Sequence, residues 1–379
     1  MKKILFVYGT RPEAIKMAPL VLKVAESRFL QPVVCLTGQH RTMLDQVNTF
    51  FNIQGDFDLN VMSPDQSLVT MTAKILHGVA AVIGECIPDL MIVQGDTTSA
   101  FAGALAAYYQ KVRVAHLEAG LRSWSKYSPF PEEINRSLIG HIADLHFAPT
   151  QSARENLARE GVVSDVFVVG NTVIDALLLG LQIIGKSGED ALKDQFHSID
   201  FSKRLILVTG HRRESFGAPF ERICAALATI ARAHEECMIV YPVHLNPSVR
   251  DPVYRILGNI NNIVLLEPLN YSHLIWLMSR CELVLTDSGG IQEEAPSLGK
   301  PVLVMRDVTE RMEGVAAGTA RLVGTDTETI VREALKLLED KSAYESMARA
   351  INPYGDGNAS PRIVEILENW MQRKINGEG

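Results

Sequence analysis

The stretch Cys281-Glu-Leu-Val-Leu-Thr-Asp-Ser-Gly-Gly-Ile-Gln-Glu-Glu-Ala-Pro-Ser-Leu-Gly-Lys-Pro301 reads as a strand, a sharp turn and the start of a helix. The apolar run ends at Asp287-Ser288, and Gly289-Gly290 allow a sharp turn because neither residue carries a Cβ. The N–H groups and positive dipole end of the next helix would face an anion such as a diphosphate. An ordinary βα turn also fits Gly-Gly, but Pro296 interrupts an ordinary helix and favours a short, specialised one.

Outward from this stretch, short apolar strands alternate with helical segments, a pattern typical of α/β proteins with parallel sheets. The sequence predicts strands at 4–8, 33–37, 90–94, 112–116, 145–148, 205–209, 238–243, 263–266, 283–286 and 302–305. It predicts helices at 12–27, 68–85, 99–110 and 132–143, and a polar linker region at 186–202. Compact domains seldom exceed about 250 residues, so we expect two Rossmann-like domains facing a ligand cleft at the carboxyl ends of the strands.

Composition limits the location and the partners of the protein. The chain has 379 residues, is 47% hydrophobic and carries a net charge of −7, which argues against nucleic acid as a partner. The sequence contains no run of about 18 apolar residues, so it predicts no membrane span. The apolar run after Met1 is too short for a signal peptide. The 5 cysteines are odd in number, widely spaced and without a CxxC pair, so we expect a reduced, cytoplasmic protein.

Basic residues follow the first strand of each predicted domain. Arg11 and Lys16 lie in Tyr8-Gly-Thr-Arg-Pro-Glu-Ala-Ile-Lys16, and His211 and Arg212 lie in Thr209-Gly-His-Arg-Arg-Glu214. Such cations suit a polyanionic substrate, although solvated surface side chains would fit the same pattern. Arg311, after the last strong strand, could reach the same cleft.

Three carboxylates stand at strand or helix ends of the first predicted domain. Asp96 follows one strand and is either a site residue or the N-cap of the next helix. Glu118 follows Val-Ala-His-Leu, where a half-buried carboxylate would suit proton transfer. Glu132 starts a helix, and simple dipole complementation is the alternative explanation there.

Other motifs narrow the chemistry. The sequence lacks GxGxxG, a P-loop lysine motif, a Gly-x-Ser-x-Gly elbow and any metal-ligand spacing, so we expect no metal and no dinucleotide cofactor. Glu293 and Glu294 could hold ribose or sugar hydroxyls, or could simply favour a helix N-terminus. His244 fits a loop histidine as well as a ligand.

Seven ordered motifs resemble those of the bacterial non-hydrolysing UDP-N-acetylglucosamine 2-epimerases. They are Gly9-Thr-Arg-Pro-Glu-Ala-Ile-Lys-Met-Ala-Pro19, Gln94-Gly-Asp-Thr-Thr98, His116-Leu-Glu-Ala-Gly-Leu-Arg122, Tyr127-Ser-Pro-Phe-Pro-Glu-Glu133, Gly170-Asn-Thr-Val-Ile-Asp-Ala176, Gly210-His-Arg-Arg-Glu214 and the stretch from Thr286 to Pro301. The likeness continues to Asn352-Pro-Tyr-Gly-Asp-Gly-Asn-Ala359 and so covers nearly the whole chain.

The resemblance implies a glycosyltransferase-B-type fold. Its first domain would be residues 1–170, carrying the acid/base carboxylates and joined by a C-terminal helix within 361–379, and its second, UDP-binding domain would be 171–360. It also implies a homodimer that interconverts UDP-N-acetylglucosamine and UDP-N-acetylmannosamine without a cofactor and supplies N-acetylmannosamine for cell-surface polysaccharide. In this family UDP is eliminated across C1–C2 to give 2-acetamidoglucal, and is then added back.

Site residues carry over motif by motif. The implied acid/base carboxylates are Asp96, Glu118 and Glu132, and His211 would stabilise the leaving diphosphate. The implied UDP-binding residues are Arg11, Lys16, His211, Ser288, Gly289, Gly290 and Arg311, with Glu294 on the ribose. Which carboxylate acts on which face of C2 is left open.

Some members of this family bind a second UDP-N-acetylglucosamine as an activator, and four residues fall where that site would be. They are Gln39, Gln66, Arg212 and His244. The chain departs from the activator-binding pattern at Thr42 and Asp65, which stand in place of Gln and Arg. Leu269 and Leu274 replace a Gln and a Phe that often frame the uracil, and Met312 replaces a proline.

Three rival functions share parts of this pattern. A glycosyltransferase of the same fold would use the Asp-Ser-Gly-Gly turn but would not need three carboxylates in the first domain. A hydrolysing 2-epimerase would release N-acetylmannosamine and UDP. A sugar-nucleotide-binding regulator would bind UDP without turnover, and the intact set of carboxylates with His211 argues against it.

Overall fold

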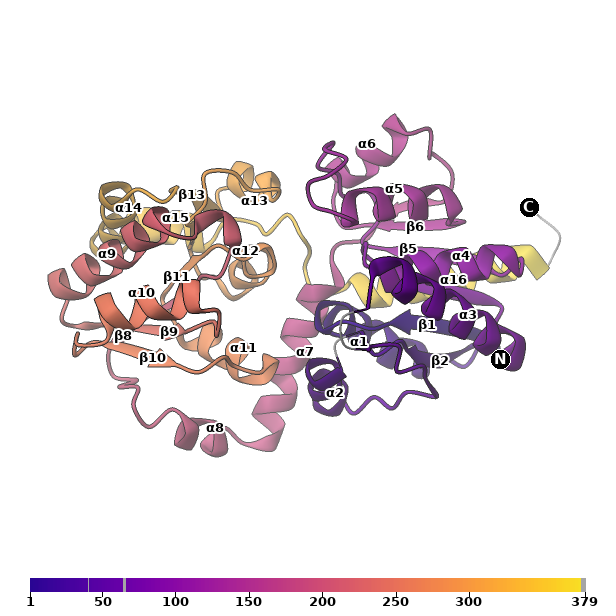
Figure 1. Ribbon diagram of the computed structural model, residues 1–379, viewed down its shortest axis with the longest axis horizontal. Helices are drawn as coiled ribbons and strands as arrows, with labels where there is room; N and C mark the ends of the chain where they lie inside the picture. Colours follow the sequence, from indigo (N-terminus) through magenta and orange to yellow (C-terminus); the bar gives the residue numbers. More distant parts are fainter. Residues whose placement is uncertain (40, 64–65, 376–379) are drawn as a thin grey trace. The chain divides into compact units, whose positions relative to one another are not determined.

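The computed structural model describes residues 1–39, 41–63 and 66–375. The chain divides into two compact units: unit 1 is Met1–Leu179 with Tyr354–Gly379, and unit 2 is Gly180–Pro353. Each unit is an α/β domain built on one parallel sheet (Figure 1). The prediction of two Rossmann-like domains is confirmed.

Unit 1 contains a parallel sheet with the strand order β3-β2-β1-β4-β5-β6-β7. Its strands are β1 (Lys2–Tyr8), β2 (Leu30–Leu36), β3 (Phe57–Asp58), β4 (Leu90–Gln94), β5 (Arg113–Leu117), β6 (Leu145–Ala148) and β7 (Val166–Val168). The strand order reverses between β1 and β4, and ligands of such sheets bind outside the carboxyl ends of the strands at this switch point.

The helices of unit 1 pack in two neighbouring groups, one running α3–α4–α5 and the other α2–α1–α16. They are α1 (Arg11–Ala25), α2 (Arg41–Phe50), α3 (Leu68–Cys86), α4 (Thr98–Tyr109), α5 (Glu132–Ile142), α6 (Gln151–Arg159), α7 (Thr172–Ser187, which continues into unit 2) and α16 (Ala359–Ile375). Figure 1 shows α16 among the elements of unit 1, as the resemblance implied. Ser27 Oγ donates to Glu368 Oε1 at 2.5 Å and helps to hold α16 there.

Unit 2 repeats the arrangement with the strand order β10-β9-β8-β11-β12-β13 and a switch point between β8 and β11. Its strands are β8 (Arg204–Thr209), β9 (Cys237–Pro242), β10 (Ile263–Leu266), β11 (Leu283–Thr286), β12 (Val302–Val304) and β13 (Ala320–Leu322). Its helices are α8 (Asp190–Gln195), η1 (Arg213–Ser215), α9 (Ala218–Ala233), α10 (Pro247–Leu257), α11 (Tyr271–Arg280), α12 (Gly289–Glu294), η2 (Ala295–Leu298), α13 (Met312–Ala317), α14 (Thr327–Glu339) and α15 (Lys341–Ala348).

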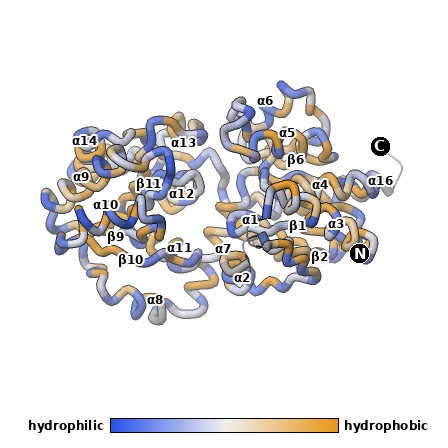
Figure 2. Tube along the Cα trace, viewed as in Figure 1, coloured by the Kyte–Doolittle hydropathy of each residue, from blue (hydrophilic) through white to orange (hydrophobic). Residues whose placement is uncertain are grey.

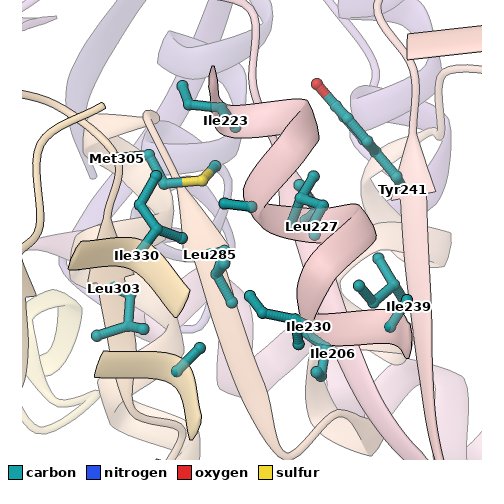
Figure 3. Close-up of a cluster of buried hydrophobic side chains, with 14 of the residues drawn as sticks. Ile206, Ile223, Leu227, Ile230, Ile239, Tyr241, Leu285, Leu303, Met305 and Ile330 are labelled. Carbon is teal, nitrogen blue, oxygen red and sulfur yellow. The ribbon is translucent and has the colours of Figure 1, made fainter. Parts of the chain in front are cut away.

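The core of unit 2 forms where α9 packs on the sheet. Ile223, Leu227 and Ile230 recur at helical spacing along α9 and are buried against branched side chains of the strands (Figure 3). Burying each such side chain contributes about 1.5–3 kcal/mol. Figure 2 shows hydrophobic residues recurring through the interior of each unit and hydrophilic residues along its outer elements. The packed sheet holds the strand ends, and therefore the site residues that follow them, in fixed positions.

Two features differ from the sequence-based expectation. The structure divides the chain after Leu179 and after Pro353, whereas the sequence placed the divisions after residues 170 and 360. The first part of α7 belongs to unit 1, so the first division lies inside this continuous helix. The stretch expected as a linker belongs to unit 2 and contains α8. Phe196 is buried there and stacks on Trp276 at 5.5 Å, and Phe201 meets the same ring edge-on at 5.3 Å, so two aromatic side chains anchor this mainly polar stretch.

The missed strands are short. β3, β7 and β13 have 2 or 3 residues each and lie at sheet edges, so they lack the apolar run by which the longer strands were recognised. One helix among the described residues, α3, is long and apolar enough to cross a membrane, judged by length and composition only. All 5 cysteines are unpaired and buried.

Candidate functional site

The candidate residues of unit 1 gather at the carboxyl ends of β1, β4 and β5. Gly95, after β4, and Glu118, after β5, both have left-handed backbones, with φ of 68° and 63°. A non-glycine residue in this region costs of order 1–3 kcal/mol, which the surrounding structure must offset. The sharp turn after β5 places the Glu118 carboxylate over the end of β4.

Three N–H donors surround the Glu118 carboxylate. Lys16 Nζ on α1 lies 2.5 Å from Glu118 Oε1, and Asn171 Nδ2 donates to the same oxygen at 3.0 Å. Gln94 Nε2, at the end of β4, donates to Glu118 Oε2. Glu118 is buried, more so than the half-buried position that the sequence predicted. Donors of this kind stabilise the charged form of a carboxylate.

Asp96 is held by α5. The interpretation of Asp96 as a helix N-cap is wrong, because Thr97 caps α4 through the N–H of Ala100. The Asp96 carboxylate instead pairs with Arg136, and Asn135 Nδ2 donates to its backbone carbonyl at 2.9 Å. Burial raises the pKa of Asp96, whereas Arg136 opposes the shift and nearby Glu118 adds to it.

The two acidic residues at the start of α5 have different surroundings. Glu133 accepts from the backbone N–H groups of Ser123 and Trp124 at 2.8–3.1 Å and pairs with Arg136, so its role is structural. Glu132 Oε2 is buried and has no hydrogen-bond partner among the described residues. A buried carboxylate oxygen without a partner is costly, so Glu132 is the member of the pair with an atom available to a ligand.

Two buried polar side chains, His116 and Glu13, hold the loops of the site in place. His116 Nε2 contacts the Gly95 carbonyl oxygen at 2.7 Å, and burial lowers the pKa of His116 to about 3. The uncharged imidazole therefore donates to that carbonyl and fixes the turn that follows β4. Glu13 accepts from the N–H groups of Gly9 and Thr10 and from Thr97 Oγ1, which joins the loops after β1 and β4.

In unit 2, Asp287 organises the loop after β8. Its Oδ2 accepts from the N–H groups of His211 and Arg212 at 2.7 and 2.8 Å, and its Oδ1 lies 3.4 Å from His211 Nδ1. The imidazole of His211 stacks on that of His244 at 5.7 Å. Burial lowers the pKa of His211, as do Arg212 and His244, while Asp287 opposes the shift. An added negative charge nearby would favour the protonated ring.

The opening of α12 is close to arginines. A Cβ on Gly289 would lie 3.2 Å from Glu310 Oε1 and 3.4 Å from Arg311 Cζ. Glu310 lies 3.3 Å from Arg311 Nη1 and 2.9 Å from Arg306 Nη1. Burial acts to raise the pKa of Glu310, but these arginines hold it below its usual value. Arginines and their paired glutamates thus lie beside the Gly-Gly turn.

The predicted short helix is confirmed, since α12 ends at Glu294 and continues only as the 3-10 turn η2. Its two carboxylates are buried: Glu293 pairs with Arg311 at 2.8 Å, and Glu294 accepts from Tyr271 at 3.4 Å. Ser288 precedes the helix, and its N–H donates to Thr286.

The remaining predicted residues lie on either unit. Arg11 is the first residue of α1, and Gln39 accepts from Ser99 at 3.1 Å. Gln66 accepts from Lys74 at 3.1 Å, and Arg212 lies 4.0 Å from Glu310. His244 accepts from the N–H of Asn246, as a satisfied loop histidine would. Asp65 lies outside the described residues.

The positions that differ from the family pattern in unit 2 have ordinary surroundings. Leu269 and Leu274 are partly buried at the start of α11, and Met312 is exposed at the first position of α13.

The sequence missed several supporting residues: Gln94, Arg136, Asn171, Asp287 and Glu310. Position could have revealed three of them, since Gln94 ends β4, Asp287 follows β11, and Arg136 is one helical turn from Glu132. Among the described residues, His234, Glu236 and Cys237 could hold a metal ion by distance. However, His234 already pairs with Glu236 and Glu339, and its pKa is raised by the bond to Glu236.

Two parallel α/β domains with charged residues at both switch points define an enzyme of the glycosyltransferase-B-like class. A family model described as UDP-N-acetylglucosamine 2-epimerase matches residues 22–368, and the chain belongs to this family.

Three relatives illustrate the similarity. The Escherichia coli K12 UDP-N-acetylglucosamine 2-epimerase is 56% identical over 370 residues, which cover 97% of this chain and 98% of that protein. The Neisseria meningitidis UDP-GlcNAc 2-epimerase bound to UDP-GlcNAc superimposes with a TM-score of 0.90 and 47% identity, over 97% of this chain and 100% of the other. The Methanocaldococcus jannaschii enzyme, in complex with UDP-GlcNAc and UDP, gives a TM-score of 0.79 and 34% identity over the same shares.

Proposed function

We propose that this protein is a non-hydrolysing epimerase that interconverts UDP-N-acetylglucosamine and UDP-N-acetylmannosamine at C2 of the sugar. The observation that carries the proposal is the cluster of Asp96, Glu118 and Lys16 at the switch point of unit 1, with Glu132 on the helix that binds Asp96. A plain nucleotide-sugar transferase has no need of this set. The product would supply N-acetylmannosamine units for cell-surface polysaccharide.

The reaction that the family resemblance implies is elimination followed by addition. A carboxylate takes the proton from C2, the C1–O bond breaks, and its electron pair leaves with UDP, giving enzyme-bound 2-acetamidoglucal. UDP then adds back to C1 while a proton reaches C2 from the opposite face. Inversion at C2 therefore needs two groups, one able to accept a proton and one able to donate it.

The surroundings of two carboxylates support a division of these roles. Glu118 receives three N–H donors, which favour an ionised, proton-accepting group. Burial raises the pKa of Asp96, which favours a group that carries a proton. Two carboxylates whose surroundings push their proton affinities apart are typical of acid/base pairs. Glu132, with one buried oxygen lacking a partner, would contact the substrate.

Unit 2 would hold the UDP portion. The turn at Ser288–Gly290 would offer N–H groups to a diphosphate, and Arg311 would reach it by exchanging its contacts with Glu293 and Glu310 for the diphosphate oxygens. Glu294 would accept bonds from the ribose hydroxyls. His211 would gain a proton as negative charge develops on the leaving diphosphate, because that charge raises its proton affinity.

The experiment that tests this function is turnover of UDP-N-acetylglucosamine in deuterated water, followed by NMR. We expect UDP-linked N-acetylmannosamine with deuterium at C2. Free N-acetylmannosamine with UDP would instead indicate a hydrolysing epimerase, and transfer to an added acceptor sugar would indicate a glycosyltransferase. Tight UDP binding without any turnover would indicate a regulator.

We further propose that the enzyme is a homodimer. Helix α3 is mainly apolar, yet only 28% of its most apolar 18-residue segment is buried. Val69 on α3 and Tyr108 and Tyr109 on α4 are 79%, 61% and 65% exposed. Exposed apolar side chains on neighbouring helices are one mark of an interaction surface, and a second copy would cover them. Sedimentation of the wild type and of Val69→Lys tests this assignment, since a dimer through α3 would dissociate in the variant.

Two smaller proposals complete the functional assignment. Unpaired, buried cysteines fit a reducing compartment, so we place the enzyme in the cytoplasm. Gln39, Gln66, Arg212 and His244 remain candidate contacts for an activating second UDP-N-acetylglucosamine, which a sigmoidal dependence of rate on substrate would support.

A further inference from the structure

Asn171 lies where two distant passages of the chain meet in unit 1. Its backbone N–H donates to the Tyr354 carbonyl oxygen at 2.7 Å, and Tyr354 is the first residue of the returning C-terminal segment. Gly170 and Gly355 make this approach possible, since a Cβ on Gly170 would lie 3.3 Å from Gly355 Cα. Helix α7 begins one residue after Asn171 and carries the chain out of unit 1 after Leu179.

The side chain of Asn171 has a defined orientation. Its Oδ1 accepts from the N–H of Val173 at 3.1 Å, in the first turn of α7. Because an amide has one oxygen and one NH2 group, this bond turns the NH2 group away from the helix. Nδ2 then donates to Glu118 Oε1 at 3.0 Å, and both side chains are buried.

This bond acts on a carboxylate that is proposed to accept a proton. An amide NH2 group can donate but cannot accept, and its bond to a carboxylate is stronger than its bond to a neutral carboxyl group, so it favours the ionised form of Glu118. Among the described residues, charged or titratable groups that face Glu118 include Lys16 on α1, Asp96 after β4 and His116 on β5. Lys16 favours the ionised form of Glu118, Asp96 would oppose it only in its own ionised form, and burial keeps His116 uncharged. Asn171 therefore adds a neutral donor beside Lys16 on the same oxygen of Glu118.

We propose that Asn171 is a positioning residue that holds Glu118 ionised and oriented for proton transfer at C2, and that ties it to the returning segment at Tyr354. The proposal rests on the function proposed above, because it assigns a consequence to the ionisation of Glu118. One of the groups that keep Glu118 ionised then lies outside the strands, at the residue before α7.

The test replaces the donor by a group of the same shape. Asn171→Asp keeps an oxygen for the N–H of Val173 but sets a second carboxylate beside Glu118. Repulsion between like charges would then make Glu118 harder to ionise, and we expect the acidic limb of the kcat profile to rise by at least about one pH unit. We expect kcat at pH values below the limb to fall about tenfold for each unit of this shift, with KM changed less than about threefold.

A second measurement, an NMR titration of the Glu118 carboxyl group, does not depend on turnover. In protein labelled with carbon-13 at glutamate carboxyls, the Glu118 signal is identified by its loss in Glu118→Gln and followed against pH. The midpoint should rise in Asn171→Asp and rise less in Asn171→Ala. This measurement remains decisive even if the wild type fails to exchange deuterium at C2, an outcome that would overturn the proposed function alone.

The matched control is Asn262→Asp. Asn262 is also buried, and its Nδ2 bridges the Ala231 and Cys237 carbonyl oxygens at 2.8 and 3.0 Å in unit 2. It should lower stability without moving the pH profile or the Glu118 signal. Wild-type profiles and an unshifted Glu118 signal in both Asn171 variants would overturn the proposal, as would an equal shift in the control.

Discussion

Lys16 and Glu118 form an ion pair with 2.5 Å between Nζ and Oε1, although 102 residues separate them in the sequence. Lys16 lies one and a half turns into α1, while Glu118 follows β5, and the two meet because β1 and β5 flank β4 in the sheet. Both side chains are largely buried, so the pair is less screened by water and salt than a surface pair. The pair links a predicted cation of the substrate site to a predicted catalytic carboxylate.

Glu118→Gln should abolish most of the turnover. The amide keeps the shape of the side chain but cannot accept a proton, so we expect kcat to fall about 10²–10⁴-fold. The measurement is the rate of UDP-N-acetylmannosamine formation together with deuterium exchange at C2. Glu26→Gln is the control, because Glu26 is exposed and pairs only with Lys23 among the contacts known for it. Wild-type exchange in Glu118→Gln would remove Glu118 from the mechanism.

Arg136→Met should change the pH dependence through Asp96. Arg136 lowers the pKa of Asp96, so its removal lets burial and Glu118 raise that pKa further. If protonated Asp96 donates to C2, the alkaline limb of the kcat profile should move to higher pH. Arg113→Met, which breaks the exposed pair with Asp144, should leave the profile unchanged. A shift of the alkaline limb to lower pH would contradict the assignment of Asp96 as the donor.

Gly289→Ala and Gly290→Ala should differ in their effects on unit 2. The Gly289 methyl would meet Glu310 at 3.2 Å, and the shift this forces on Glu310 and Arg311 should cost about 1–3 kcal/mol of folding free energy. The Gly290 methyl meets nothing closer than 3.9 Å, so that variant should fold normally. We expect UDP affinity, measured by calorimetry, to fall in both, because the diphosphate would approach both positions. Unchanged UDP affinity in the stable Gly290→Ala protein would place the diphosphate elsewhere.

His116 should make unit 1 less stable in mild acid. Its pKa is about 3 in the folded protein and about 6.5 when unfolded, so the unfolded chain binds one more proton between these values. Stability from this residue is fully present above pH 6.5 and is lost as pH falls towards 3, by up to about 1.4 kcal/mol per pH unit. His116→Gln should flatten the dependence of the urea midpoint on pH, whereas exposed His141→Gln should not. Parallel curves for wild type and His116→Gln would show that His116 is already charged.

Much of the fold could be predicted because local sequence patterns encode its longer strands and helices. Apolar runs located the long strands, and the helices predicted at 68–85 and 132–143 begin at the residues where α3 and α5 begin. Edge strands such as β7 were not predicted, because 3 residues are too few to show an apolar run. The polar sequence around α8 predicts a linker, and only tertiary contacts, those of Phe196 and Phe201 with Trp276, show that the stretch is packed.

The site residues, too, could be predicted only in part from the sequence. The sequence by itself determined which residue types stand at the carboxyl ends of the strands, and a parallel sheet places such ends along one edge. It could not decide between a cap and a site residue for Asp96, nor separate Glu132 from Glu133. Only the tertiary structure made those choices, by placing Arg136 on Asp96 and the N–H groups of Ser123 and Trp124 on Glu133. Hydrogen bonds between residues far apart in the chain depend on how elements pack, and no local pattern encodes that packing.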